Sequence, residues 1–270
     1  MTAKEFSGHY PIERRAGEVE RLRLQAEAMA PDAAAMLDRI GVSAGWRCLE
    51  IGCGPGGITS LMSERVGSSG RVVGLDMDAE FLELARSKAA PNTEFRQGDA
   101  YNSGLAPDSF DLVHMRFVAS TAGQPERLIA EAKRLARPGG TVALQEPDGT
   151  TLKCYPPHPA WDTLQRVLMD TFAGGGADLA LAHKLYAMLR ASGLEDVQYR
   201  PFIVGVRSTD PMVDYLPSTV ESLRGTVARL ALIADAELDQ ALADCRAHLA
   251  RPDTVFTMYT VAQVWGRKPG

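Results

Sequence analysis

Hydrophobic and polar positions alternate along residues 45–150 in two different rhythms. Short apolar runs predict buried strands, and longer segments with apolar residues every three or four positions predict amphipathic helices. Strands are predicted at residues 47–51, 71–76, 93–96, 110–115 and 141–146. Helices are predicted between them at residues 58–66, 79–89 and 125–136. Strands and helices that alternate in this way form a parallel sheet covered by helices on both faces.

The pattern changes on either side of this alternation. The N-terminal part has helical spacing over residues 18–29, and Pro31 predicts the start of a second helix that ends at Gly41. The chain after Glu146 enters a proline-rich loop, residues 147–159. Further helices are predicted at residues 160–172, 179–191 and 211–247, and two further strands at residues 194–206 and 254–265.

These segments predict one α/β domain rather than two independent ones. Residues 1–40 are expected to form an N-terminal helical cover, and residues 41–150 a ligand-binding core. Residues 151–270 are expected to supply lid helices and the last two strands of the same domain. Ligands of such sheets bind beyond the carboxyl ends of the strands, which makes the residues at those ends the first candidates for function.

A glycine-rich loop follows the first predicted strand and opens the next helix. Gly52, Gly54 and Gly57 match the spacing G-x-G-x-x-G, and Asp76 lies 19 residues further on. Glycines at such a turn adopt positive φ angles and let a ligand touch the backbone. The same pattern is a fingerprint of dinucleotide binding, so a nicotinamide cofactor is one reading of this loop.

Acidic residues argue for a different ligand. Glu50 stands two residues before the first glycine, where its charge would face the pyrophosphate of a dinucleotide. Asp76 and Asp99 end the second and third predicted strands. One such Asp is as often a helix cap or turn residue. Three acids at successive strand ends suit a cation that carries amine and hydroxyl donors.

At these residues the chain resembles the class I S-adenosylmethionine-dependent methyltransferases. The resemblance covers residues 45–146 and rests on five stretches: Leu49-Glu-Ile-Gly-Cys-Gly-Pro-Gly56, Val73-Gly-Leu-Asp76, Gly98-Asp-Ala100, Phe110-Asp-Leu-Val113 and Arg137-Pro-Gly-Gly140. It implies a Rossmann-like α/β fold: a seven-stranded, mostly parallel sheet with helices on both faces and a helical lid insertion. It also implies S-adenosylmethionine as the cofactor.

The resemblance assigns expected roles to residues at the strand ends. Glu50 and the backbone of Gly52, Cys53 and Gly54 would meet the methionine amino-carboxylate end. Asp76 would bind the ribose hydroxyls, with Met77 against the adenine. Asp99 would accept the adenine amino group, with Ala100 beside it. Met115 and Arg116 would close over the cofactor.

The two ends of the chain resemble one branch of that family, the small-molecule methyltransferases related to the ubiquinone and menaquinone group. In that branch the leading helix lies over the cofactor, so Tyr10 and Gln25 are candidates for lid contacts. A plain amphipathic helix explains the same residues. The C-terminal stretch Gln263-Val-Trp-Gly-Arg-Lys-Pro269 also resembles this branch.

Residues for the chemical step are less sharply marked. Glu146 ends the fifth predicted strand and is a candidate base or charge stabiliser, or only a partner for a helix cap. His158, in the proline-rich loop, could reach the pocket or could be an exposed loop residue. The paired acid expected of a magnesium-dependent enzyme after the fourth strand is missing, so no metal is expected.

Composition narrows the class of partner. The chain of 270 residues has 29 basic and 34 acidic residues, a net charge of −5, which argues against nucleic-acid binding. Apolar runs are too short for a membrane span, and the start of the chain lacks the apolar core of a signal peptide, so a cytoplasmic protein is expected. A homo-oligomer is compatible with this composition.

The sequence thus predicts transfer of a methyl group from S-adenosylmethionine to a small, apolar or aromatic metabolite, on carbon or oxygen. Quinone-type methylation and natural-product tailoring in secondary metabolism both fit. An NAD(P)-dependent oxidoreductase on the same sheet is the first alternative, although no Tyr-x-x-x-Lys motif is identified. A cyclase or scaffold that binds the cofactor without methyl transfer is the second.

Overall fold

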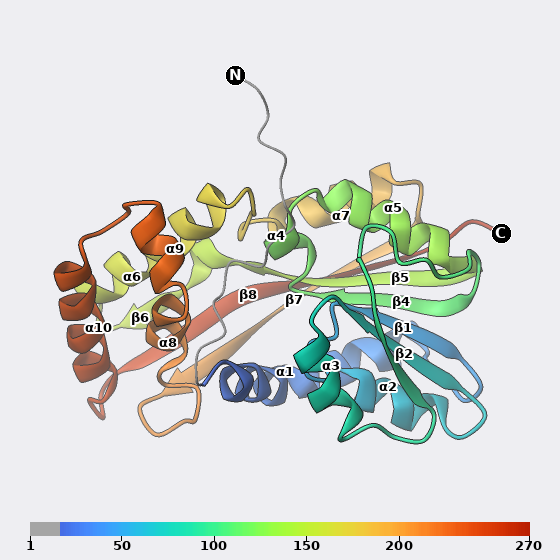
Figure 1. The fold of residues 1–270 in the computed structure, drawn as a ribbon, viewed down its shortest axis with the longest axis horizontal. Coiled ribbons are helices and arrows are strands. Elements are labelled where there is room, and N and C mark those ends of the chain that lie inside the picture. Colours follow the sequence, from blue (N-terminus) through green and yellow to red (C-terminus); the bar gives the residue numbers. More distant parts are fainter. Residues whose placement is uncertain (1–16) are drawn as a thin grey trace.

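The computed structural model describes residues 17–270, in which one central sheet is flanked by helices (Figure 1). The first four strands of the alternating region are short and lie close to the predicted positions, whereas the fifth begins at Ala136, five residues before its predicted start. They are β1 (Arg47–Ile51), β2 (Arg71–Asp76), β3 (Thr93–Gln97), β4 (Phe110–Arg116) and β5 (Ala136–Asp148). Three more strands follow: β6 (Lys153–Tyr155), β7 (Glu195–Arg207) and β8 (Val255–Arg267).

Strands from the alternating region and from the rest of the chain belong to one sheet. Along the sheet the strands run β3-β2-β1-β4-β5-β8, with β7 pairing on the outer side of β8. The first five strands are parallel, and β8 is antiparallel to β5. The predicted Rossmann-like, mostly parallel fold is therefore confirmed.

The short strand β6 was not predicted, because the proline-rich segment read as a loop. It continues along β8 beyond the end of β5, where Lys153 pairs with Thr257 and Tyr155 pairs with Val255. β8 is long enough to hold β5 and β6 one after the other on the same side. A partner strand of this length is a tertiary feature that local sequence does not show.

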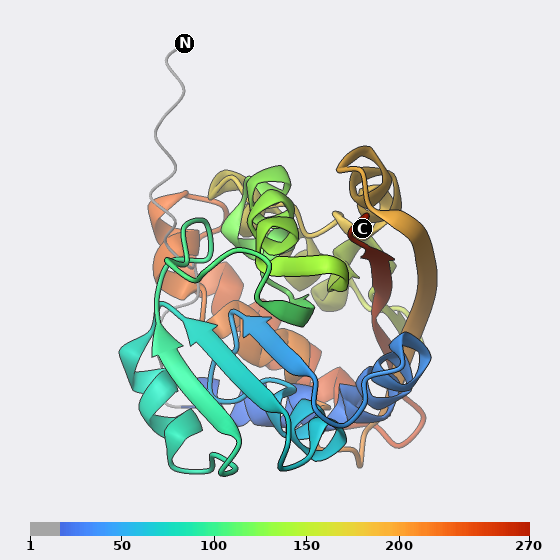
Figure 2. The same ribbon diagram turned by 90° about the vertical axis from the view of Figure 1, so that its right-hand side faces the viewer.

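Two layers of helices cover the sheet. On one face, α1 (Glu18–Ile40) and α2 (Thr59–Val66) pack on alternate side chains of the strands, among them Cys48, Leu112 and Ala143. On the other face, α5 (Pro125–Leu135) and α7 (Ala182–Ala191) pack on the intervening side chains. Figure 2 shows the blue and cyan helices on one side of the strands and green helices on the other.

The N-terminal cover differs from its prediction. Two helices separated at Pro31 were expected, but α1 continues through this residue to Ile40 and ends at Gly41, whose φ is 83°. A proline inside a helix removes one backbone hydrogen bond, here to the Glu27 carbonyl. Buried apolar side chains before and after it, Met29 and Ala33, hold the helix on the protein. Glu27 and Pro31 are both exposed, so the freed carbonyl can bind water.

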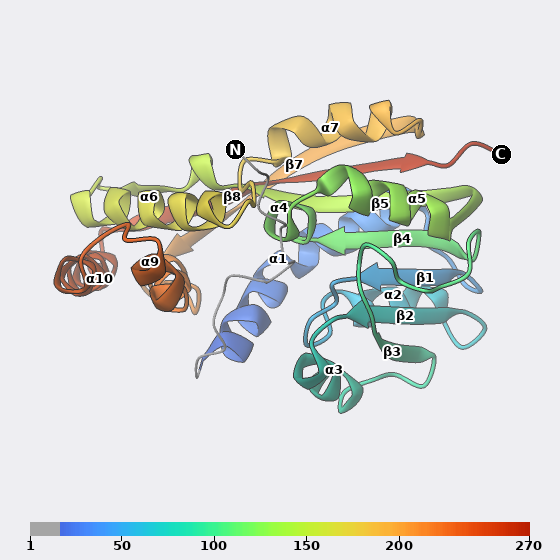
Figure 3. The same cartoon turned by 45° about the horizontal axis from the view of Figure 1, so that its top comes forward.

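A group of helices lies beyond the carboxyl ends of the strands. Figure 3 shows α6, α9 and α10 past the ends at which the arrows of β1 and β4 point. The helices of this group are α6 (Pro159–Gly174), α8 (Tyr215–Glu221), α9 (Arg224–Arg229) and α10 (Asp235–Leu249). They share a core around Trp161, Leu216 and Leu238. The short α3 (Ala79–Arg86), α4 (Ala119–Ala122) and 3-10 turn η1 (Gly149–Thr151) complete the described elements.

Candidate functional site

A cleft of about 2090 Å³ lies between the strand ends and the helical cover. Its sheet side is lined by the glycine loop and by the residues that end β2 and β3, including Asp76, Met77 and Ala100. Its opposite side is lined by α1 and by residues of the lid such as Phe172 and Tyr215. The predicted strand-end residues and the predicted cover therefore face one shared space.

The glycine loop has the backbone that its sequence predicts. Gly52 has a φ of 68° and Gly57 a φ of 45°, a region that other residues rarely adopt. A Cβ atom on Gly57 would lie only 2.3 Å from Oε1 of Glu50. The loop therefore closes directly over the Glu50 carboxylate, and a side chain at position 57 would displace it.

Polar groups of this loop are already paired in a way that disfavours a diphosphate ligand. Both carboxylate oxygens of Glu50 accept from the Ile58 N–H, at 3.1 and 2.9 Å, just where α2 begins. The N–H groups of Gly52 and Cys53 both donate to the Leu75 carbonyl. A pyrophosphate needs free N–H donors at the start of the helix. Here a carboxylate occupies that place, so the geometry argues against the nicotinamide alternative.

The side chain of Cys53 is unsuited to catalysis. Its side chain is buried, and burial raises the pKa of the thiol far above its ordinary value. A neutral buried thiol is a packing group rather than a nucleophile. Cys53 therefore contributes its backbone to the cleft wall.

Asp76 organises the end of β2. Its Oδ2 accepts from the Gly54 N–H at 2.7 Å, and its Oδ1 accepts from the Asp78 N–H at 2.9 Å. Burial raises the pKa of Asp76, although these N–H donors counteract the shift. The next side chain, Met77, is 59% exposed at the cleft. One carboxylate thus ties the glycine loop to the second strand and still borders the open space.

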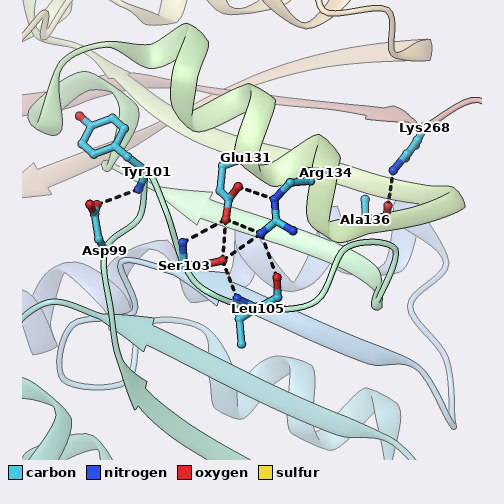
Figure 4. Close-up of polar contacts among 8 residues, drawn as sticks. All are labelled: Asp99, Tyr101, Ser103, Leu105, Glu131, Arg134, Ala136 and Lys268. Carbon is cyan, nitrogen blue, oxygen red and sulfur yellow. Dashed lines mark hydrogen bonds and ion pairs between the residues drawn. The ribbon is translucent and has the colours of Figure 1, made fainter.

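Asp99 begins a loop that is fastened to α5 (Figure 4). Its Oδ1 accepts from the Tyr101 N–H at 2.8 Å. Further along, the Ser103 hydroxyl donates to Glu131, which also forms an ion pair with Arg134. This network holds the segment after Asp99 in place, so the position of Asp99 at the cleft depends on α5 as well as on β3.

The other half of the cleft combines aromatic rings with a buried cation. Tyr259 packs edge to face against Phe117 and Tyr215, with ring centroids 6.0 and 5.8 Å apart. The Tyr215 hydroxyl accepts from Gln25 at 2.6 Å, which ties α1 to α8. Arg116 lines the same space, and its buried Nη1 has no hydrogen-bond partner among residues 17–270. Burial lowers the pKa of Arg116.

The structure corrects the assignment of Glu146. This side chain is fully buried, and its two oxygens accept from the N–H groups of Ala119 and Ser120 at 3.0 and 3.1 Å. It points to the sheet face opposite Gln145 because side chains alternate along β5. Glu146 holds the start of α4 and lies outside the cleft lining. These contacts fit the role of a helix partner, which was one of the alternatives for this residue.

Two more predicted site residues, His158 and Met115, also lie away from the cleft. His158 is the residue before α6, where its Nδ1 accepts from the Ala160 N–H and its ring stacks on His248 at 4.5 Å. Neither His158 nor Met115 lines the cleft. Met115 is fully buried in the core under α5, since the alternation along β4 turns it away from the face that carries Arg116. Tyr10, a further predicted site residue, lies outside the described residues.

Some cleft residues were not among the predicted site residues. Tyr259 and Phe117 form the aromatic wall, and Arg21 lies over the Tyr215 ring at 5.6 Å. Phe117 directly follows β4, Tyr259 lies inside β8 and Arg21 lies in α1, so the hydrophobic pattern of each segment does not set these residues apart as a site.

Among residues 17–270, no group of three His, Cys, Asp or Glu side chains is arranged to hold a metal ion. Within the same residues, every helix is too short or too polar to cross a membrane.

Comparison with known proteins gives a consistent picture. Residues 49–144 match the family described as methyltransferase domain. The match contains the glycine loop, Asp76, Asp99 and Arg116, and it ends just before Glu146. The predicted resemblance to class I methyltransferases is thereby confirmed.

Individual relatives agree with this family. The chain is 35% identical over 123 residues to a demethylmenaquinone methyltransferase of Lactococcus lactis, a match that covers 44% of this chain and 49% of that protein. A solved structure from Bacillus halodurans C-125, described as a methyltransferase, has a TM-score of 0.60 at 18% identity and covers 89% of this chain and 100% of that one.

A second solved structure carries a cofactor. It is a phosphoethanolamine N-methyltransferase 2 of Haemonchus contortus in complex with S-adenosyl-L-methionine, with a TM-score of 0.54 at 18% identity. It covers 89% of this chain and 53% of that one. At these identities the solved structures establish the fold. The chain spans at most about half the length of the curated relatives it matches first.

Proposed function

We propose that this protein transfers a methyl group from S-adenosylmethionine to a small, apolar or aromatic metabolite, on carbon or oxygen. The methyltransferase domain at residues 49–144 supports the reaction class. The observation that carries the proposal is the pairing of the glycine loop with Glu50. The N-terminus of α2 is filled by that carboxylate, and the cleft wall beside it is acidic. Such a wall suits a cationic ligand better than a diphosphate.

Residues at the strand ends would hold the adenosine part. Asp76 borders the cleft with two carboxylate oxygens, each of which keeps a lone pair to accept from a ribose hydroxyl. Met77 and Ala100 offer apolar surface for the adenine ring. Asp99, held by the Tyr101 N–H, would accept from the adenine amino group.

The amino-acid part of the cofactor carries a positive ammonium group and a negative carboxylate group. The cleft offers a partner of opposite charge for each. Glu50 would receive the ammonium group. The N–H groups of Gly52 and Gly54 are engaged by Leu75 and Asp76, so the loop would assist through its carbonyl groups rather than these donors. Arg116, with its unpaired buried Nη1, would bind the carboxylate. A buried guanidinium without an anion is costly, so this site fits a bound carboxylate.

Transfer itself asks little covalent chemistry of the protein. The cofactor supplies a methyl group that is already activated by the positive sulfur. The cleft residues orient the acceptor and exclude water, which accounts for much of the rate in such reactions. The aromatic wall of Phe117, Tyr215 and Tyr259 would hold an apolar or aromatic acceptor in place.

The direct test uses S-adenosylmethionine with a labelled methyl group and metabolite extracts, with calorimetry of S-adenosylhomocysteine and NADH in parallel. We expect S-adenosylhomocysteine to bind, NADH not to bind, and label to appear in small organic products. Binding of NADH alone would establish the oxidoreductase alternative. Cofactor binding without any labelled product would favour the non-methylating cyclase or scaffold.

Replacing Glu50 by glutamine is expected to weaken the binding of S-adenosylhomocysteine more than the binding of its deamino analogue. The carboxylate would lose its charge but keep its size, so the loss should be about 10-fold for the ligand that carries the ammonium group. Calorimetry with both ligands measures the difference. Equal losses for the two would mean that Glu50 only supports the loop through Ile58.

Replacing Arg116 by methionine is expected to give the complementary result. S-adenosylhomocysteine should bind about 10-fold more weakly, and its decarboxylated analogue should lose little. The same pair of titrations on Arg127→Met serves as the matched control, since Arg127 also lines the cleft but lies over the Tyr101 ring. A similar loss for both ligands would remove Arg116 from the carboxylate site.

Cytoplasmic location and a homo-oligomeric state remain predictions, as does the absence of a nucleic-acid partner. The division into a cover, a core and a lid is likewise a proposal. It receives support from the Gln25–Tyr215 hydrogen bond, which joins the N-terminal helix to the lid across the cleft.

A further inference from the structure

A row of buried polar side chains crosses the sheet beneath α1. The row crosses five strands that are neighbours in the sheet, β1, β4, β5, β8 and β7. Its members, in the same order, are Glu50, His114, Gln145, Gln263 and Arg200. The first four are at most 1% exposed. They belong to the face that carries α1 and α2, because each lies two residues from an apolar side chain of that core: Cys48, Leu112, Ala143 and Trp265.

Hydrogen bonds along this row run in one direction, which starts at Arg200. A guanidinium can only donate, so the Gln263 atom that faces it at 2.7 Å must be the amide oxygen. The Gln263 nitrogen then points the other way. It donates to the Gln145 oxygen at 3.0 Å and to the Asp32 carbonyl at 2.9 Å. Asp32 also pairs with Arg200 at 2.9 Å, which holds the guanidinium in place.

The direction passes through the second amide to the histidine. Because the Gln145 oxygen faces Gln263, its nitrogen faces Nε2 of His114 at 2.9 Å. This ring nitrogen must accept, so the proton of the neutral ring sits on Nδ1. Burial lowers the pKa of His114, which keeps the ring neutral. Nδ1 lies 3.6 Å from Oε1 of Glu50.

We propose that Arg200 is a positioning residue that sets the tautomer of His114, so that an N–H group and not a lone pair faces Glu50. The opposite tautomer would turn a lone pair toward the carboxylate and would set two N–H groups against each other at Gln145. Arg200 stands on β7, four strands away from Glu50. The consequence for cofactor binding rests on the proposed function, whereas the tautomer itself does not.

Nuclear magnetic resonance of ring-labelled histidine tests the tautomer directly in the ligand-free protein. The nitrogen shifts distinguish Nδ1–H from Nε2–H, and the His114→Gln variant assigns the signal. In the wild type we expect the Nδ1–H form to dominate. A dominant Nε2–H form would overturn the proposal.

Gln263→Glu is the sharpest variant because it preserves size and reverses the direction. The new carboxylate can accept from Arg200 but cannot donate to Gln145. Gln145 should therefore turn its nitrogen toward the carboxylate and its oxygen toward His114. The ring must then donate from Nε2, so the dominant tautomer should invert. A folded variant that retains the Nδ1–H form would contradict the chain of bonds.

Arg200→Met and Arg200→Lys provide a second, independent test. In the methionine variant only the Asp32 carbonyl still orients Gln263, so the share of the Nε2–H tautomer should increase. Lysine is also a pure donor and should restore the Nδ1–H form. Arg207→Met is the matched control, because Arg207 lies on the same strand but pairs with Asp210 instead of Gln263. If Arg200→Met leaves the tautomer unchanged, Arg200 has no such role.

Affinity for S-adenosylhomocysteine separates this inference from the proposed function. We expect Gln263→Glu and Arg200→Met to bind it about 3-fold to 10-fold more weakly, with recovery in Arg200→Lys. If the wild type does not bind it at all, the proposed function fails while the tautomer results still stand. If it binds and the tautomer inverts without any change in affinity, the link from His114 to the cofactor is wrong.

Discussion

Replacing Asp76 by alanine is expected to weaken the binding of S-adenosylhomocysteine by about 100-fold or more. The carboxylate would lose its charge-assisted bonds to a ribose diol, each of which contributes about 1.5–3 kcal/mol. The glycine loop would also lose its tie to β2, because Asp76 accepts from the Gly54 N–H. Calorimetric titration of the purified variant measures the loss.

Asp111 offers a matched control for this variant. Its oxygens also accept from a backbone N–H, that of Arg47, and from a second donor, the Arg137 guanidinium. It lies at the opposite end of the sheet from the cleft, where β4 begins. Asp111→Ala should lower stability but leave the affinity unchanged. Equal affinity losses in both variants would point to general loosening of the sheet, and an unchanged affinity in Asp76→Ala would remove Asp76 from the ribose site.

Replacing Glu146 by glutamine is expected to change how stability depends on pH. Burial raises the pKa of Glu146 from its ordinary value of 4.5 to about 7. The folded protein therefore holds this proton more tightly than the unfolded chain does. The wild type should lose free energy of unfolding as the pH rises from about 4.5 to about 7, by up to about 3 kcal/mol from this group. Above that range the cost is complete.

The glutamine variant lacks this titration. Relative to the wild type, its free energy of unfolding should rise across the same range, as urea denaturation at a series of pH values can measure. Glu131→Gln is the control of opposite sign. The Arg134 guanidinium lowers the pKa of Glu131 to about 2, so its stabilising contribution is lost only as the pH falls below about 4.5. If the difference between Glu146→Gln and the wild type is independent of pH from 4.5 to 8, Glu146 does not titrate as proposed.

The chain itself determined the strands, the glycine loop and the acids at the strand ends. These features depend on neighbours a few residues apart. Alternating strands and helices require a parallel sheet, and the carboxyl ends of parallel strands meet at one edge. The sequence alone therefore places Asp76 and Asp99 together at the cleft. Glycines with positive φ at Gly52 and Gly57 follow from the same local reasoning.

Only the tertiary structure decided which face and which neighbours each side chain meets. Met115 and Arg116 are adjacent in sequence, but one is in the core under α5 and the other lines the cleft. Glu146 looked catalytic at its strand end until the structure placed it against α4. Helices cover both faces of a parallel strand, so composition does not show toward which face a side chain points.

Long-range packing likewise overrode local signals. α1 continues through Pro31 because burial of Met29 and Ala33 offsets the lost hydrogen bond. The row from Glu50 to Arg200 joins five strands that are far apart along the chain, and no local pattern relates them. Hydrogen-bond direction in such a row depends on partners whose role is fixed: the Arg200 guanidinium, which can only donate, and the Asp32 carbonyl, which can only accept. That dependence exists only once the sheet has brought its members into contact.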